Sequence, residues 1–300
     1  MNIAFCGDKD VAEPIGVCLA ALRRQIAEQG QASISLLTTG WTEEQTRFVR
    51  QCSGDLDIEI HDFPSVSLPA IRAGRHVTQG AYLVFLVPTV MERRSRAIYL
   101  DSDILIRADP QPLFSLDMKD HATAGVRVGG HPFVGSPGAY PRWRQMGLNP
   151  QAPLVNTGVL VMDLDRWRAE DIGGRALSFA QRHGEDLLWA DQGALNAVLQ
   201  GDWLPIHPRW NATRSVFDDD KGLYAVESSQ VIDEARQDPA IVHFTGATKP
   251  WKHGVERPYA DEWRRLADTV GWRPWKDPVP LRTRASLARK RLRSWRRGRG

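Results

Sequence analysis

Cysteine is scarce in this chain. Its 300 residues include three, Cys6, Cys18 and Cys52, and no two of them form a CxxC pair. An odd number without that spacing argues against a disulfide framework and a zinc ribbon, and it is typical of proteins from a reducing compartment. We therefore expect a cytoplasmic protein.

Long hydrophobic runs and glycine-rich phosphate loops are also missing. The longest apolar run, AYLVFLV at residues 81–87, ends at Pro88 and is too short to span a bilayer. Acidic residues at Asp8, Asp10 and Glu13 interrupt the start of the chain, where a signal peptide needs a basic start and an apolar stretch. Neither G-x-G-x-x-G nor G-x-x-x-x-G-K-[ST] occurs, so nothing indicates a dinucleotide cofactor or a P-loop.

The C-terminal stretch has no acidic residues. Nine Lys or Arg lie between Arg282 and Arg299 without one Asp or Glu, so the rest of a chain with net charge +3 is mildly acidic. This distribution does not suggest nucleic-acid binding by the whole protein. We expect one catalytic domain over residues 1–277 and a basic tail over residues 278–300.

What the chain does contain is an alternation of strand-like and helix-like segments. A content of 42% hydrophobic residues is enough for a large, well-buried core. Strands separated by helices predict an α/β fold with a parallel sheet covered on both faces. Strands are expected at residues 2–6, 33–38, 57–63, 97–100 and 241–244. Helices are expected up to residue 29, after the capping box of Thr42 and Gln45, and over residues 78–94.

Two carboxylates follow one of these strands directly. In YLDSDILI, residues 99–106, Asp101 and Asp103 flank a small serine, and the strand at residues 2–6 likewise ends close to Asp8. Ligands of open α/β sheets bind at the carboxyl ends of the strands. A solvated acidic turn is the structural alternative. After a buried strand, however, two like charges held close together favour a cation between them, either Mg²⁺ or Mn²⁺.

A second polar stretch is IVHFTGATKPW, residues 241–251. His243 closes an expected strand, Gly246 permits a close backbone approach, and Lys249 supplies a positive charge suited to a phosphate. A lone histidine on a strand is most often structural. Added to Asp101 and Asp103, it makes a mixed nitrogen and oxygen ligand set that favours Mn²⁺ over Mg²⁺.

Five blocks of the sequence together resemble glycosyltransferase family 8. That family includes bacterial galactosyl- and glucosyltransferases of lipopolysaccharide synthesis, and glycogenin. The blocks occur in the family's order between residue 2 and about residue 251; they are YLDSDILI, LVNTGVLVMDLDRWR, DQGALNAVL, WLPIHPRWN and IVHFTGATKPW. A D-x-D motif alone is weak, whereas five ordered blocks are specific.

The resemblance implies a GT-A type, Rossmann-like fold and a Mn²⁺-dependent transfer from a UDP-sugar to a glycan or glycolipid acceptor, with retention of anomeric configuration. It implies the following roles by motif: Asp101, Asp103 and His243 as metal ligands, Asp8 at the uracil, Gly246 and Lys249 at the diphosphate, Asn156 and Asp191 at the sugar, and Gln192 beside the anomeric carbon. Stabilising the leaving diphosphate is the main catalytic requirement, which a divalent metal and a lysine meet.

Some positions depart from the family pattern or allow a structural reading. Val84 stands where the family commonly has an arginine, and Val11 stands where a ring often packs near the base. Gln192 carries an amide, a poor nucleophile, so a front-face substitution competes with a covalent intermediate. Asn156 is also compatible with a turn cap, and Asp191 with a helix start.

Three other classes stay open at this point. One is a non-catalytic nucleotide-sugar-binding relative, which Val84 would suit. Another is a metal-dependent nucleotidyl- or phosphotransferase, although no third carboxylate or phosphate loop is evident. The last is a nucleic-acid-binding protein, a class that only the basic tail supports.

The tail generates a prediction about membranes. Five of its apolar residues form one stripe: Leu281, Ala285, Ala288, Leu292 and Trp295. They recur every three or four positions amid basic neighbours, a pattern that suits a helix lying on the anionic inner face of the plasma membrane.

The full chain should sediment with anionic liposomes, less so as salt rises, whereas a chain truncated after Asp277 should not. Equal pelleting of both forms, or no preference for anionic lipid, would exclude the tail as an anchor.

Overall fold

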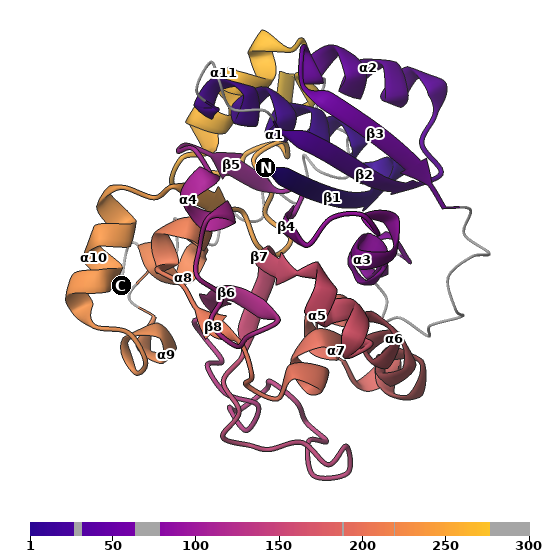
Figure 1. The fold of residues 1–300 in the computed structure, drawn as a ribbon. Coiled ribbons are helices and arrows are strands. Elements are labelled where there is room, and N and C mark those ends of the chain that lie inside the picture. The colour runs from indigo at the N-terminus through magenta and orange to yellow at the C-terminus, as the bar shows by residue number, and fades with distance from the viewer. Residues whose placement is uncertain (27–31, 64–78, 188, 219, 277–300) are drawn as a thin grey trace, which may run out of the picture. The chain divides into compact units, whose positions relative to one another are not determined.

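The structure is a computed structural model that describes residues 1–26, 32–63, 79–187, 189–218 and 220–276 (Figure 1). The chain forms two compact units, Met1–His243 and a second unit that starts at Phe244. The expected helical tail over residues 278–300 and its boundary at residue 277 lie outside the described residues, so both stay predictions. Within the described ranges, every helix is too short or too polar to cross a bilayer.

The first unit is built on two sheets. A seven-stranded sheet has the order β3-β2-β1-β4-β7-β6-β8, and a two-stranded sheet pairs β5 with β9. The strands are β1 Asn2–Asp8, β2 Ser33–Thr39, β3 Asp57–Asp62, β4 Arg96–Leu100, β5 Ile104–Ile106, β6 Thr123–Arg127, β7 Val155–Asp163, β8 Leu204–Pro205 and β9 Ile241–His243.

Helices connect and cover these strands. The α-helices are α1 Ala12–Gln25, α2 Glu43–Ser53, α3 Val87–Val90, α4 Gln111–Phe114, α5 Leu164–Ala169, α6 Ile172–His183, α7 Ala190–Leu199, α8 Arg214–Phe217, α9 Lys221–Tyr224, α10 Ser229–Gln237 and, in the second unit, α11 Ala260–Thr269. Turns of 3-10 helix are η1 Lys9–Val11, η3 Gln79–Leu86, η4 Gly184–Asp186, η5 Pro208–Asn211 and η6 Pro274–Lys276.

The large sheet is mixed, so the expectation of a parallel sheet is only half right. Strands β3, β2, β1 and β4 are parallel, whereas β7 runs antiparallel to both β4 and β6. The parallel half follows the strand–helix alternation that the sequence displays. The antiparallel half arises because β7 enters the sheet from a long connection that contains no crossover helix.

The local signals read from the sequence are largely confirmed. The Thr42 hydroxyl accepts from the Gln45 backbone N–H at 3.1 Å and the Gln45 side chain accepts from the Thr42 N–H at 3.1 Å, which is the expected capping box of α2.

The expected helix over 78–94 is wrong as a continuous α-helix. Residues 79–86 form the 3-10 helix η3, only one α-helical turn follows with Pro88 at its start, and the chain then turns.

Close packing joins α1 to α2. A side chain at Gly16 would place its Cβ 2.7 Å from the Phe48 ring and 3.1 Å from the Cys52 sulfur, so glycine permits the two helices to approach. A large hydrophobic core cluster contains buried residues of β1, β4 and β7 together with residues of η3, α6 and α7. The sheet is therefore covered by helices, as the α/β expectation requires.

An asparagine on α7 supplies hydrogen bonds that a strand would otherwise give to the start of β7. Strand β4 ends at Leu100, opposite Val159, so residues 155–158 lie beyond its pairing. The Asn196 side chain supplies these hydrogen bonds instead. Its amide oxygen accepts from the Val155 N–H and its amide nitrogen donates to the Val155 carbonyl, both at 2.8 Å. This pairing fixes α7 against the first residues of β7, where several predicted site residues lie.

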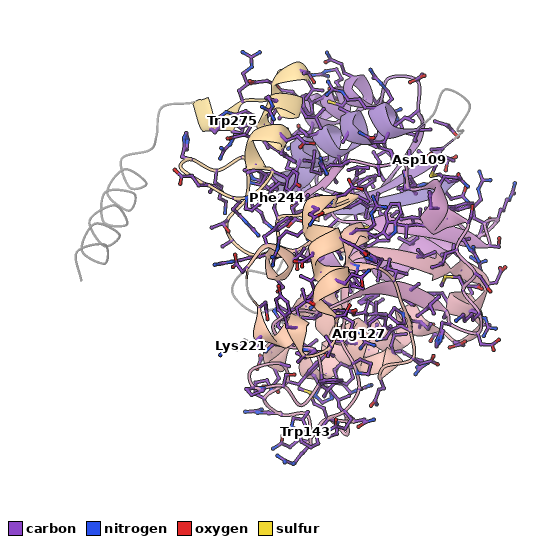
Figure 2. The ribbon with its side chains drawn as sticks, turned by 90° about the vertical axis from the view of Figure 1, so that its left-hand side faces the viewer. Asp109, Arg127, Trp143, Lys221, Phe244 and Trp275 are labelled. Carbon is purple, nitrogen blue, oxygen red and sulfur yellow. The ribbon has the colours of Figure 1, made fainter. Side chains whose placement is uncertain are left out.

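The connection between β6 and β7 is long and contains no α-helix. It returns on itself through a bridge between Phe133 and Pro153, and the Tyr140 hydroxyl donates to the Gly193 carbonyl of α7 at 2.6 Å. Figure 2 shows Trp143 at the tip of this connection, away from Arg127 at the end of β6. Connections of this length usually carry function or form a compact loop.

Tryptophan rings hold the second unit together. Trp263 of α11 is fully buried, and its ring centroid lies 5.3 Å from that of Trp251, 5.7 Å from that of Trp272 and 6.1 Å from that of Trp275. These tryptophans pack against one another and do not form an open stacking platform.

Candidate active site

The predicted site residues of the first unit meet at one edge of the large sheet. Parallel pairing of β1 with β4 brings Asp8 and Asp101 to the same edge, at the carboxyl ends of their strands. Strand β7 runs the other way and begins at this edge, so Asn156 and Thr157 join them. The Asp101 N–H donates to the Gly158 carbonyl at 2.9 Å and ties the two strand ends together.

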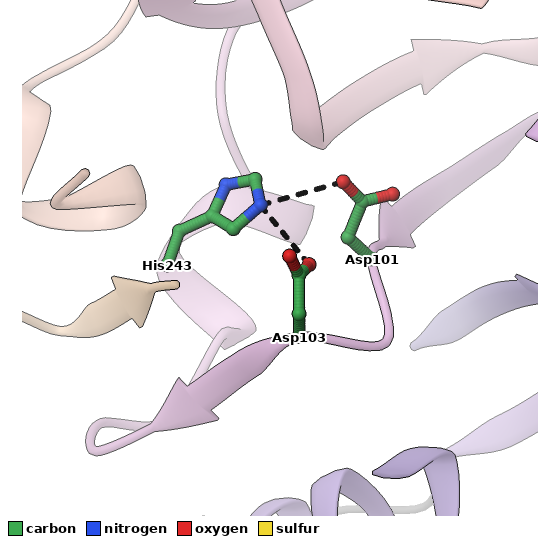
Figure 3. A group of neighbouring side chains, drawn as sticks. All are labelled: Asp101, Asp103 and His243. Carbon is green, nitrogen blue, oxygen red and sulfur yellow. Dashed lines mark ion pairs between the residues drawn. The ribbon is translucent and has the colours of Figure 1, made fainter. Parts of the chain in front are cut away.

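Asp101, Asp103 and His243 form a compact cluster (Figure 3). The His243 Nε2 atom lies 3.1 Å from an Asp103 carboxylate oxygen and 3.5 Å from an Asp101 oxygen. One potential ligand atom from each residue lies within 4.8 Å of the others. Two carboxylates and an imidazole are a donor set for a divalent cation, so these residues fit the metal that the sequence predicted.

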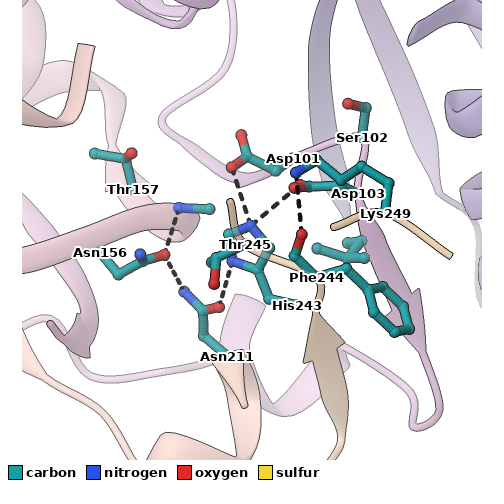
Figure 4. Close-up of polar contacts among 12 residues, drawn as sticks. Asp101, Ser102, Asp103, Asn156, Thr157, Asn211, His243, Phe244, Thr245 and Lys249 are labelled. Carbon is teal, nitrogen blue, oxygen red and sulfur yellow. Dashed lines mark hydrogen bonds and ion pairs between the residues drawn. The ribbon is translucent and has the colours of Figure 1, made fainter. Parts of the chain in front are cut away.

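The ring of His243 is held from behind by a buried asparagine. Its Nδ1 lies 2.8 Å from the Asn211 side-chain oxygen, and Asn211 is fully buried (Figure 4). A glycine makes room for the ring on another side, because a Cβ at Gly158 would stand 2.1 Å from His243 Cε1 and 2.9 Å from an Asp101 oxygen. Any larger residue at position 158 would displace two of the three candidate ligands.

Two further side chains support the D-x-D turn. The Tyr99 hydroxyl donates to Asp101 Oδ1 at 2.7 Å. Burial first, and then the Asp101 charge, raise the pKa of Tyr99 well above its ordinary value, so the hydroxyl keeps the proton that it donates. Cys18 of α1 lies 3.3 Å from the Ser102 carbonyl and 3.5 Å from that of Ile104. Burial also raises the pKa of the Cys18 thiol, which therefore serves as a neutral donor.

Asp191 and Gln192 lie at the start of α7 and both contact Thr157. The Thr157 hydroxyl donates to an Asp191 carboxylate oxygen at 3.1 Å, and the Thr157 N–H donates to the Gln192 side-chain oxygen at 3.3 Å. Burial first, and then the nearby Asp101 charge, raise the pKa of Asp191 to about 7, against hydrogen bonds that lower it. Among the residues that the structure describes, no ion pair between Asp191 and a basic side chain is found, which leaves its charge poorly compensated.

Asp8 is at the expected end of β1, where it also caps the following turn. Its Oδ1 atom accepts from the Asp10 N–H at 2.9 Å, and its carbonyl accepts from the Trp41 indole at 3.0 Å. One carboxylate oxygen of Asp8 therefore has a structural role besides the predicted contact with uracil.

Gly246 and Lys249 belong to the second unit. Gly246 has φ +80°, a conformation that favours glycine, and a Cβ there would meet nothing within 4 Å. The glycine is thus explained by its backbone conformation alone. The Lys249 ammonium donates to the Phe244 carbonyl at 3.0 Å and curls back over its own loop.

The two departures from the family pattern have structural explanations. Val84 is completely buried in the core cluster that contains η3, so its side chain offers no surface to a bound sugar. Val11 packs against the end of β1, since a Cβ at Gly7 would stand 2.2 Å from the Val11 Cγ2 atom.

Sequence reasoning missed several residues that shape the site. Tyr99 was detectable, because alternation along a strand puts residues 99 and 101 on the same face. Thr157 and Gly158 lie within a quoted block, next to Asn156, but their types carry no specific signal. Asn211 ends the block WLPIHPRWN, and nothing in the sequence alone relates it to His243.

Comparison with known proteins identifies the family. Residues 2–254 match the model of Glycosyl transferase family 8. The chain belongs to this family. It is therefore a glycosyltransferase, and this decides among the classes that the sequence left open.

Individual relatives agree with this membership. General stress protein A of Bacillus subtilis (strain 168) is 26% identical over 286 residues, which cover 93% of this chain and 97% of that protein. Lipopolysaccharide 1,2-glucosyltransferase of Escherichia coli (strain K12) is 22% identical over 93% of this chain and 80% of its own length. The crystal structure of the galactosyltransferase LgtC with donor and acceptor sugar analogues matches with a TM-score of 0.71 and 21% identity, over 95% of this chain and 99% of that one. The last match confirms the GT-A type fold.

The raised pKa of Asp191 predicts a pH dependence of stability. Because the folded state keeps a proton that the unfolded state releases, the contribution of Asp191 is complete below about pH 4 and disappears as pH rises through about 7. In urea unfolding with EDTA, Asp191→Asn should gain stability relative to the parent protein between these values and change no further above them. Parallel stability curves for the two proteins would contradict the raised pKa.

Proposed function

We propose that this glycosyltransferase is a Mn²⁺-dependent, retaining hexosyltransferase that moves a sugar from a UDP-sugar to a glycan or glycolipid. The observation that carries the proposal is the cluster of Asp101, Asp103 and His243 at the carboxyl edge of a GT-A type sheet. Its mixed nitrogen and oxygen set favours Mn²⁺ over Mg²⁺.

Different residues of the chain bind different parts of the donor. A cation held by the cluster would neutralise charge on the diphosphate. Asp8 contacts the uracil, and Gly246 and Lys249 hold the diphosphate, with the lysine offering a charge-assisted hydrogen bond. Asn156 and Asp191 line the sugar pocket. In support, Asn156 and Asp191 come from different elements, β7 and α7, that the Asn196 pairing holds together.

The chemistry of Gln192 helps to decide which mechanism would retain the anomeric configuration. Its side-chain oxygen already accepts from the Thr157 N–H, and the residue is buried. An amide is a weak nucleophile, and this one is also oriented by the backbone. A front-face substitution, in which the departing phosphate helps to deprotonate the acceptor, therefore suits the site better than a covalent intermediate on Gln192.

A relative and the basic tail support a proposal for the biological setting. Similarity to an E. coli lipopolysaccharide glucosyltransferase supports a role in cell-surface polysaccharide or lipopolysaccharide synthesis. We place the enzyme in the cytoplasm, with its basic tail on the anionic inner face of the plasma membrane beside lipid-linked acceptors.

The metal cluster predicts that Asp103 is essential for transfer. Asp103→Asn keeps the size of the side chain but removes a charged ligand, so it should abolish UDP release from UDP-sugars supplied with Mn²⁺, and EDTA should do the same to the parent protein. Asp57→Asn, the same change at an exposed position on β3, is the control and should retain activity. Undiminished release by Asp103→Asn or in EDTA would refute the assignment.

Lys249 predicts a loss of nucleotide affinity. A charge-assisted hydrogen bond to the diphosphate is worth about 1.5–3 kcal/mol, so Lys249→Ala should weaken UDP binding by roughly 10- to 100-fold in calorimetry. Lys252→Ala is a matched control, because the Lys252 ammonium also donates to a carbonyl five residues earlier, that of Ala247, at 3.0 Å. Equal UDP affinity in the two variants would remove Lys249 from the site.

A further inference from the structure

A chain of side-chain amides leads from the backbone of β7 to His243 (Figure 4). The Gly158 N–H lies 3.0 Å from the Asn156 side-chain oxygen. The same oxygen lies 2.8 Å from the Asn211 amide, whose other end lies 2.8 Å from His243 Nδ1. Each link is within hydrogen-bond distance, and each of its atoms belongs to the first unit of the chain.

The direction of every bond in this chain follows from its first member. A backbone N–H only donates, so the Asn156 atom that faces Gly158 is the oxygen. The Asn211 atom that faces this oxygen must then donate and is the NH₂ group, which leaves the Asn211 oxygen toward His243. An oxygen only accepts, and His243 Nδ1 must therefore carry a proton.

The consequence appears on the other side of the ring. With the Nδ1 proton committed to Asn211, the neutral imidazole presents the unprotonated Nε2 to the Asp101 and Asp103 oxygens, at 3.5 Å and 3.1 Å. A lone pair facing two carboxylates is the arrangement of a cation ligand. The opposite tautomer would point a hydrogen into the metal position.

We propose that Asn211 is a positioning residue that sets the tautomer and orientation of His243 for the metal, and that it anchors both through Asn156 to the backbone of β7. Asn156, for which the family resemblance implies a role at the sugar, thereby also takes part in metal binding, so the two subsites share one hydrogen-bonded framework. This inference rests on the proposed metal role of His243.

Burial explains how one amide enforces this arrangement. Asn211 is 0% exposed and His243 4% exposed, so water does not replace a lost bond easily. Asn211 is also the last residue of η5, and the adjoining Ala212 carbonyl accepts from the His243 N–H at 3.0 Å. The backbones of residues 212 and 243 are thus joined, and the side-chain contact has little freedom to rearrange.

The first test measures the tautomer directly. Nitrogen-15 histidine spectra of the neutral imidazole, recorded in EDTA, should show His243 with the proton on Nδ1; loss of the signal in His243→Ala assigns it. A His243 with its proton on Nε2 would overturn the inference, whatever the outcome for catalysis.

The second test measures Mn²⁺ affinity by calorimetry or electron paramagnetic resonance, without a donor sugar. Asn211→Leu should weaken Mn²⁺ binding by about 10- to 100-fold, the usual effect of removing a residue that orients a metal ligand. Asn211→Asp keeps an acceptor for the Nδ1 proton but loses the donor that faces the Asn156 oxygen, so its loss of Mn²⁺ affinity should be smaller than that of Asn211→Leu. Circular dichroism establishes that each variant is folded.

A double-mutant cycle separates positioning from a general structural effect. If Asn211 acts through His243, Asn211→Leu should cause no further loss of Mn²⁺ affinity in a His243→Ala background. Equal losses with and without His243, or unchanged affinity in Asn211→Leu, would overturn the inference. A parent protein that binds no Mn²⁺ would instead refute the proposed metal role, while the tautomer measurement still decides the hydrogen-bond chain.

Discussion

Two carboxylates and an imidazole nitrogen share one small space at the end of β4, and the organisation of the site follows from this electrostatic constraint. Asp101, Asp103 and His243 Nε2 present their acceptor atoms to one another within 4.8 Å. Such groups repel unless a cation stands between them. Tyr99 donates to the far oxygen of Asp101, and Asn211 takes the Nδ1 side of His243, so both direct the remaining lone pairs inward.

Strand direction places the other residues around this point. In an all-parallel sheet only strand ends would reach the carboxyl edge, whereas the antiparallel β7 delivers its beginning there. Asn156, Thr157 and Gly158 are thereby set beside Asp101, and Asn196 closes the unpaired edge of β7 against α7. The mixed sheet and the amide pairing together bring Asp191 and Gln192 into contact with Thr157.

The sequence revealed those parts of the fold and site that have local causes. The capping box of α2, the strands at β1, β2 and β4, and the D-x-D turn follow from patterns within a few residues. The cluster of Asp101 and Asp103 with His243 was predicted because β9 carries a recognisable block. The antiparallel β7 and the roles of Asn211 and Gly158 depend on contacts between residues far apart in sequence. Asn211 precedes its partner by 32 positions, and an asparagine has no signature that identifies such a partner.

The environment of Asp191 distinguishes its role from that of the metal cluster. A carboxyl group with a pKa of about 7 exists in both protonation states near neutral pH. Both states accept hydrogen bonds from sugar hydroxyls, and the protonated state also donates one. In the proposed reaction Asp191 therefore holds the sugar by hydrogen bonding and needs no fixed charge. Gln192 beside it is neutral at every pH and is oriented by the same Thr157. In the proposed reaction, charge on the donor is thus handled at Asp101 and Asp103, and sugar geometry by neighbours that contribute little charge of their own.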